Sequence, residues 1–382
     1  MKTSLLMLLA LSLSSFVCAQ APEAPAIPEK VQKRILKQQP QVDVDGDGKI
    51  SVGELKEVYS TLPAKVQMAI AIQYPELVGG APEVQAESAE PEASSEDLKK
   101  LTVAPPLEGA AKGYNCLFLG HSFFRPMASR MMGQHASELG IAPAKNKSGG
   151  PESLLVFAGG QNGHPLALLN REGTCAAGKA KLDEGKTELI GMTYFPETNP
   201  ITGELIPELE GYDSIKGYRA WVEYAVKAGN PLRKVFIAMP WAYYPEKLSY
   251  EVRSLNMKSN AQSVLHPIID GLRAEFPQIE FMITPYGQGA FELEKMFDNG
   301  ELAEDGITQK FGSRKGPKGV SIYNDTLGHG STILVALSEL IWLYSVFDVD
   351  LDEYDYDTGY KADLKSAAKR VVDKYPKLYS GK

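Results

Sequence analysis

From residue 107 onward, short apolar runs with strand character alternate with segments of helical periodicity. Two of the runs, 189–195 and 235–240, are apolar almost throughout and lack the polar alternation of a half-exposed strand, which is typical of parallel strands covered on both faces. The order of the segments predicts an α/β domain over 107–382, with a parallel sheet between helices. Strands are expected at 114–119, 187–195, 234–240 and 279–284, and helices at 126–140, 213–228, 259–275, 289–298, 331–346 and 361–374.

The first nineteen residues have the features of a secretory signal. Lys2 supplies a positive start, and the apolar run 5–13 is too short to span a bilayer. Small residues before Gln20 predict cleavage after Ala19, and Val17 makes a lipid anchor on Cys18 a poor fit. We therefore expect a secreted or periplasmic protein that does not span a membrane.

A twelve-residue acidic loop, Asp43–Glu54, matches the EF-hand calcium loop. Gly48 occupies the position of the sharp turn, and the four carboxylates repel one another unless a hard cation neutralises them. The alternative is an acidic, glycine-rich turn that binds nothing. A single loop favours a structural or extracellular Ca²⁺ site over a sensor. The loop is expected to lie in a small all-α segment at 20–78. The expected ligands are the side chains of Asp43, Asp45, Asp47, Ser51 and Glu54 and the backbone carbonyl of Lys49.

Composition separates this segment from the α/β domain. Residues 79–106 are rich in Glu, Ser, Ala and Pro and hold few large apolar side chains, which predicts a flexible acidic linker. The whole chain has a formal charge of -8 and no basic stripe, so no nucleic-acid partner is expected. Outside the signal, Cys116 and Cys175 could pair in an exported protein, but two unpaired thiols are the favoured interpretation.

Ser122 is the candidate nucleophile of the large domain. It follows the first predicted strand and Gly120, so it should lie at the carboxyl edge of the sheet, where open α/β sheets bind ligands. A serine needs a histidine base whose tautomer is fixed by a third group, and Asp325 and His329 precede the last apolar helix of the sheet domain. Ser122 could instead be a helix N-cap. The G-x-S-x-G elbow of α/β-hydrolases is missing.

On Gly120-His121-Ser122 and the block around Asp325 and His329, residues 107–346 resemble the SGNH/GDSL hydrolase family. The resemblance implies a flavodoxin-like three-layer fold and serine esterase activity. The family separates its aspartate and histidine by two residues, whereas three lie between them here and Thr326 occupies the aspartate position. For the family's oxyanion and substrate residues the candidates are Gly150, Asn199 and Gln288.

Two functions are therefore expected. The first is an exported, calcium-binding serine esterase that hydrolyses acyl esters, with acylated carbohydrate as a substrate class suggested by analogy. The alternative is a non-catalytic extracellular binding module of the same fold with a structural calcium site.

Overall fold

The chain divides into two units, Met1–Glu92 and Ala93–Lys382, and the boundary falls inside the segment expected to be a linker. In the first unit only Asp47–Lys49 are described, so the predicted signal, most of the helical segment 20–78 and the linker 79–106 lie outside the described residues. The second unit holds the α/β domain. The computed structural model describes residues 47–49, 113–145, 153–194 and 214–381.

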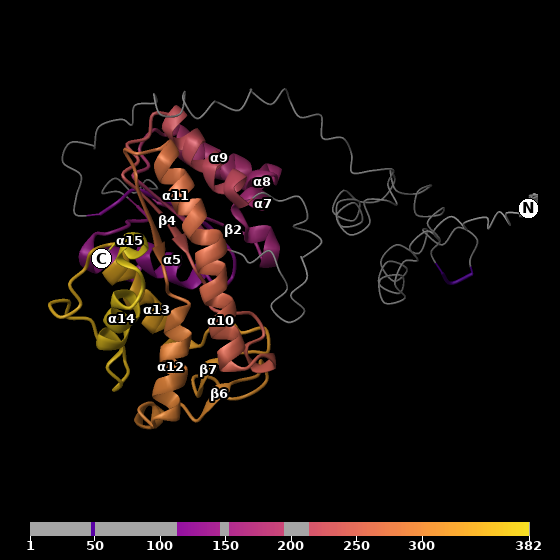
Figure 1. The fold of residues 1–382 in the computed structure, drawn as a ribbon, viewed down its shortest axis with the longest axis vertical. Helices are drawn as coiled ribbons and strands as arrows, with labels where there is room; N and C mark the ends of the chain where they lie inside the picture. Colours follow the sequence, from indigo (N-terminus) through magenta and orange to yellow (C-terminus); the bar gives the residue numbers. More distant parts are fainter. Residues whose placement is uncertain (1–46, 50–112, 146–152, 195–213, 382) are drawn as a thin grey trace, which may run out of the picture. The chain divides into compact units, whose positions relative to one another are not determined.

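The α/β domain is built on a five-stranded parallel sheet with the order β2-β1-β3-β4-β5 (Figure 1). The predicted parallel α/β fold is confirmed, and this strand order is that of flavodoxin-like sheets. Every residue of β1, β3 and β4 is buried, as the uninterrupted apolar runs predicted. The strands are β1 (Cys116–Gly120), β2 (Leu154–Phe157), β3 (Leu189–Thr193), β4 (Lys234–Ala238) and β5 (Glu280–Thr284).

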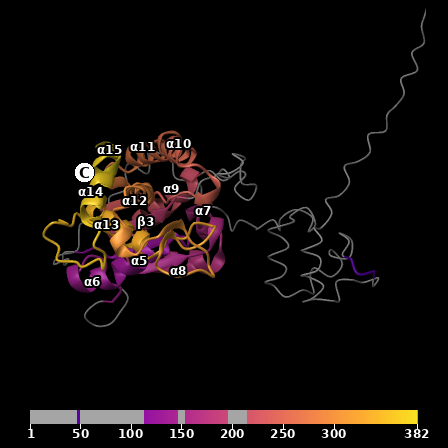
Figure 2. The same cartoon turned by 90° about the horizontal axis from the view of Figure 1, so that it is seen from below.

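Helices cover the sheet in two groups (Figures 1 and 2). The chain passes from β1 to β2 in one direction and from β2 to β5 in the other. Because parallel connections are right-handed, the first crossover lies on one face and the later ones on the opposite face. The helices are α5 (Arg125–Met132), α6 (Gln134–Leu139), α7 (Pro165–Leu169), α8 (Glu172–Asp183), α9 (Ser214–Lys227), α10 (Tyr250–Asn260), α11 (His266–Glu275), α12 (Gln288–Asp298), α13 (Thr332–Ser345), α14 (Leu364–Asp373) and α15 (Lys377–Ser380).

The helix α13 anchors the first face. It packs against α5 and α14. Its Trp342 meets Phe236 of β4 edge-on at 4.9 Å between ring centroids and Phe124 at 5.0 Å. These contacts bury the helix almost completely and fix the position of the loop that precedes it.

Two predicted helices differ from those observed. The segment 126–140 is divided into α5 and α6 at Gly133, whose backbone leaves the helical region (φ -109°, ψ -98°). The segment 259–275 begins earlier, at Tyr250, because the Ser249 hydroxyl caps the Val252 N–H of α10. A π-helical turn, η7 (Ala261–Leu265), then joins α10 to α11.

Several smaller elements were not predicted. They include β2, α7, α8 and a two-stranded parallel pair, β6 (Gln309–Phe311) and β7 (Ser321–Tyr323). Short 3₁₀ turns lie at Gly160–Gly163, Pro245–Lys247 and Ala303–Asp305. Cys116 and Cys175 are unpaired, as expected. Among the described residues, no helix has the length and apolar character needed to cross a bilayer.

Candidate active site

Ser122 lies in a tight turn between β1 and α5, at the carboxyl edge of the sheet. The backbone N–H groups of Phe124 and Arg125 both donate to the His121 carbonyl, at 3.1 and 3.0 Å. The helix α5 has Phe124 at its N-cap and no side-chain cap, so the Ser122 hydroxyl does not serve as a helix cap. The turn therefore presents Ser122, half-buried, with its hydroxyl available to another group.

That group is His329, whose ring also contacts the carboxylate of Asp325. The Ser122 Oγ lies 3.0 Å from Nε2 of His329, and Nδ1 of the same ring lies 2.9 Å from Oδ2 of Asp325. An ionised carboxylate only accepts hydrogen bonds, so Nδ1 carries the proton and Nε2 accepts from the Ser122 hydroxyl. The structure thus joins the three residues singled out in the sequence into one serine–histidine–aspartate chain.

Asp325 is held as an anion by four donors. Its Oδ1 accepts from the backbone N–H groups of Gly328 and His329, at 3.0 and 3.1 Å. Its Oδ2 accepts from Nε of Arg314 at 3.1 Å as well as from His329. Burial of Asp325 opposes ionisation, but the hydrogen bonds from His329 and Arg314 outweigh it and lower the pKa to about 2.

The extra residue between Asp325 and His329 is accommodated by Gly328. Its φ of +100° is strained for any other residue, and a Cβ there would come within 2.7 Å of Pro245 Cδ. Asn324 closes the loop from both sides, because its N–H donates to the His329 carbonyl at 2.7 Å and its Nδ2 to the Gly330 carbonyl at 2.8 Å. The longer spacing therefore still brings the carboxylate to Nδ1.

A buried ion pair supports the strand that leads into this loop. Arg253 of α10 makes two hydrogen bonds to Glu294 of α12, at 2.6 and 2.7 Å, and both side chains are almost fully buried. Tyr323, the last residue of β7, donates to the same carboxylate at 2.7 Å. Asn324 and Asp325 follow Tyr323 directly. The loop that carries Asp325 and His329 therefore begins at a residue that is held in place by Glu294.

An aromatic cluster supports the histidine. The Phe123 ring meets His329 edge-on at 5.0 Å and stacks on Tyr243 and Trp241, at 4.6 and 5.2 Å between centroids. Trp241 Nε1 donates to the Gly328 carbonyl at 2.6 Å. Trp241 is 2% exposed, so it is an interior residue that positions the loop and does not offer a face to a ligand.

His121 has a positioning role beside the nucleophile. It is fully buried, and its Nδ1 accepts the Phe123 N–H at 3.1 Å while Nε2 faces Thr193 Oγ1 at 3.0 Å. Burial lowers the pKa of His121 to about 4, so the ring is neutral at neutral pH. Because the Phe123 N–H is engaged in this way, the turn geometry around Ser122 is fixed.

The oxyanion candidates are described only in part. Within the described part of the chain, the backbone N–H of Ser122 has no hydrogen-bond acceptor. Gly150 and Asn199 lie outside the described residues. Gln288 begins α12 and lines a pocket formed by α10, α12 and α14, a pocket whose lining includes no member of the triad.

Most of the predicted calcium loop is also outside the described residues. Of the six expected ligands only Asp47 and Lys49 are described, and the Lys49 N–H donates to Asp47 Oδ1 at 2.7 Å. Gly48 between them has φ +79°, a conformation suited to the sharp turn expected there. Asp43, Asp45, Ser51 and Glu54 are not described. The described residues elsewhere contain no group of three or more His, Cys, Asp or Glu side chains that could hold a metal ion.

Sequence reasoning missed the supporting residues Phe123, Tyr243 and Arg314. Phe123 follows the serine directly and was a usable signal for packing around the base, whereas Phe124 packs against Trp342. Arg314 comes from the connection between β6 and β7, two short strands that no sequence pattern indicated.

Comparisons with known proteins do not assign this chain to a family. No protein-family model, no curated protein and no solved structure matches this chain.

Acid stability offers a test of the Asp325 environment. The pKa of Asp325 in the folded protein lies below its ordinary value of 3.8. The ionised carboxylate therefore stabilises the fold above about pH 4, and this contribution is lost as the pH falls toward 2. We expect the free energy of unfolding, measured in urea, to fall more steeply between pH 4 and pH 2 for the wild type than for Asp325→Asn. Equal slopes would show that Asp325 does not have a depressed pKa.

Proposed function

We propose that the α/β domain is a serine esterase, in an exported protein that also carries an EF-hand calcium loop. The observation that carries the proposal is the unbroken hydrogen-bond chain from Ser122 Oγ through the His329 ring to the Asp325 carboxylate. A serine that only packed or capped would not require a histidine held in one tautomer by an anion with four donors. The parallel sheet supports the proposal, since its carboxyl edge is where such folds bind substrates.

The geometry suits acyl transfer in two steps. Ser122 Oγ attacks the ester carbonyl while its proton passes to Nε2 of His329, and Asp325 stabilises the resulting imidazolium. His329 then gives the proton to the alcohol oxygen as the carbon–oxygen bond breaks, which leaves an acyl group on Ser122. A water molecule gives its proton to His329 and attacks this acyl group, and the proton returns to Ser122 as the carboxylic acid departs.

The negative charge on the carbonyl oxygen needs donors. The Ser122 N–H is the described candidate, and we propose Gly150 and Asn199 as its partners by their resemblance to the SGNH pattern. One such donor typically lowers the barrier by about 3 kcal/mol. The carbohydrate part of the substrate remains a proposal from the same resemblance.

The direct test is hydrolysis of short chromogenic esters, p-nitrophenyl acetate and butyrate. The purified protein should release p-nitrophenolate catalytically and faster than buffer, with saturation at high ester concentration. Turnover no faster than that of a folded protein without a triad would refute the esterase proposal.

Calcium binding is tested separately, because the loop and the triad lie in different units of the chain. Titration by calorimetry should give one Ca²⁺ per chain, and Asp43→Ala or Glu54→Ala should each remove the heat of binding, since each deletes a charged ligand. Asp352→Ala, a loss of an exposed carboxylate outside the loop, is the matched control and should bind normally. Unchanged binding in both loop variants would contradict the EF-hand assignment.

A further inference from the structure

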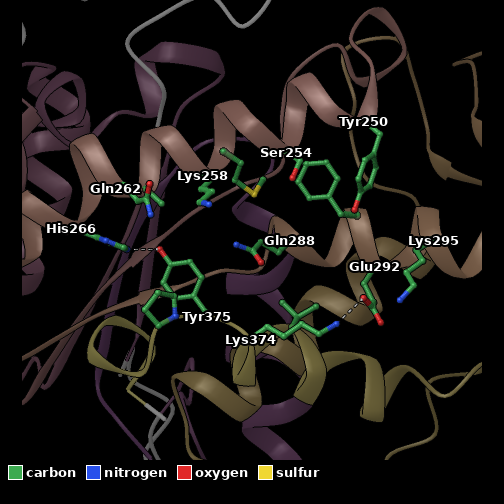
Figure 3. A pocket seen from close by; sticks show the side chains of 15 residues that line it. Tyr250, Ser254, Lys258, Gln262, His266, Gln288, Glu292, Lys295, Lys374 and Tyr375 are labelled. Atoms are coloured by element: carbon green, nitrogen blue, oxygen red, sulfur yellow. Dashed lines mark hydrogen bonds and ion pairs between the residues drawn. The ribbon is translucent and has the colours of Figure 1, made fainter.

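The pocket that Gln288 lines is formed by α10, the π-helical turn, α12 and α14 (Figure 3). Its volume of about 420 Å³ is in the range of small-molecule sites. No triad residue contributes to its lining. The proposed esterase therefore gives this pocket no role.

The walls of the pocket are apolar and aromatic. Met257, Val371 and Tyr375 are nearly buried and line its inner surface. Toward the outside, Tyr250 meets Phe291 edge-on at 5.1 Å, and Tyr250 remains 44% exposed. Rings at the mouth and apolar side chains inside suit a flat organic ring, which aromatic side chains contact edge-on or by stacking.

The charge of the pocket is positive. Three lysines line it, Lys258, Lys295 and Lys374, against one carboxylate, Glu292. Glu292 is already engaged by Arg370 at 2.8 Å and lies 3.9 Å from Lys374. Lys258 and Lys295 form no ion pair within the described part of the chain. Cations that are not neutralised beside an apolar cavity favour an anionic ligand.

Gln288 and the π-helical turn complete the site. The Gln288 side chain points into the pocket from the first turn of α12, and Lys258 lines the same pocket from α10 (Figure 3). Ala261 and Gln262 of the π-helical turn form the adjoining wall. Such turns cost regular hydrogen bonding and are frequent at functional sites. Gln288, which the sequence indicated as a binding residue, therefore lines a pocket to which no triad residue contributes.

We propose that this pocket binds a small aromatic anion, a single ring bearing a carboxylate or phosphate group. The ring lies against Tyr250 and Phe291, and the anionic group is held by Lys258 with the amide N–H of Gln288. The proposal does not depend on the esterase, since it uses none of the triad residues.

Calorimetric titration of the full chain with benzoate and with phenyl phosphate tests the proposal, and the tighter of the two identifies the anionic group. At least one probe should bind saturably, and added salt should weaken it because the contact is partly exposed. Benzyl alcohol, which keeps the ring and lacks the charge, should bind at least tenfold more weakly. No saturable binding of either anion, or equal binding of the alcohol, overturns the proposal.

Variants locate the binding. Lys258→Glu should weaken the anion at least tenfold, and Ser254→Trp, which fills the pocket from the face of α10, should abolish binding. Lys186→Glu is the matched control, an exposed charge reversal outside the pocket, and should bind as the wild type does. Circular dichroism checks that each variant is folded. Ester hydrolysis by Lys258→Glu should equal that of the wild type. Anion binding that survives both pocket variants would place the ligand elsewhere and refute the assignment.

Discussion

Alanine in place of Ser122 is expected to lower kcat for short acyl esters by about 10⁶-fold, because no other group in the triad can form the acyl intermediate. His329 and Asp325 would remain in place, since the hydrogen bond from Ser122 is only one of the contacts that hold His329. Phe123 and the Asp325 carboxylate fix the ring independently. The fold and the free energy of unfolding should therefore change little.

Ser129→Ala is the matched control for this variant. Ser129 is an exposed serine on the same helix that follows the nucleophile, and it lies outside the triad. Its turnover should equal that of the wild type. Equal turnover by Ser122→Ala and the wild type would mean that hydrolysis, if observed, arises elsewhere.

Asparagine in place of Asp325 is expected to lower kcat by about 10⁴-fold. The backbone N–H groups of Gly328 and His329 both point at Oδ1, so the amide oxygen must occupy that position. The amide nitrogen then replaces Oδ2 and donates to Nδ1 of His329, which forces the proton onto Nε2. A protonated Nε2 cannot accept the proton of Ser122. The amide would also face the Arg314 Nε–H, donor against donor.

Asp352→Asn removes an exposed ion pair with Lys369 and serves as the acid-to-amide control. Surface pairs of this kind contribute little to stability, and turnover should not change. If Asp325→Asn kept activity within tenfold of the wild type, another group would have to orient His329. The three-residue spacing between Asp325 and His329 would then not serve to place the acid against the base.

The sequence was most informative where one physical requirement dominates. Strands buried on both faces are apolar at nearly every position, so β1, β3, β4 and most of β5 were found to within a few residues of their ends. The edge strand β2 was missed because it is four residues long and only partly buried. The helix α8 was missed because its residues, with Gly173, Thr174 and Gly178 among them, show no clear apolar face.

The residues of the candidate site could be predicted from the sequence, but the contacts between them could not. Ser122, Asp325 and His329 were each placed by chain order, at the edge of the sheet or before the last apolar helix of the sheet domain. The link between the acid and the base depended on the positive φ of Gly328 and on the hydrogen bond from Trp241 to its carbonyl. Neither follows from spacing. Arg314 reaches Asp325 from a connection with no periodic pattern, so its role appears only in three dimensions.

Gln288 illustrates a different limit. Its position after the fourth predicted strand suggested the substrate-binding edge, and it does begin the helix that follows β5. Its side chain, however, lines the pocket beside α10 and α14. Chain order locates the end of a strand, but the direction of a side chain depends on the helices packed around it.

The activation of Ser122 as a nucleophile is tested most directly by labelling with a fluorophosphonate, which reacts with a serine only when a base and an oxyanion site activate it. We expect one covalent adduct per folded chain by intact mass spectrometry, mapped to the peptide that contains Ser122 and lost in Ser122→Ala. Lack of any adduct on the folded protein would contradict an active serine hydrolase and favour a non-catalytic binding module built on the same fold.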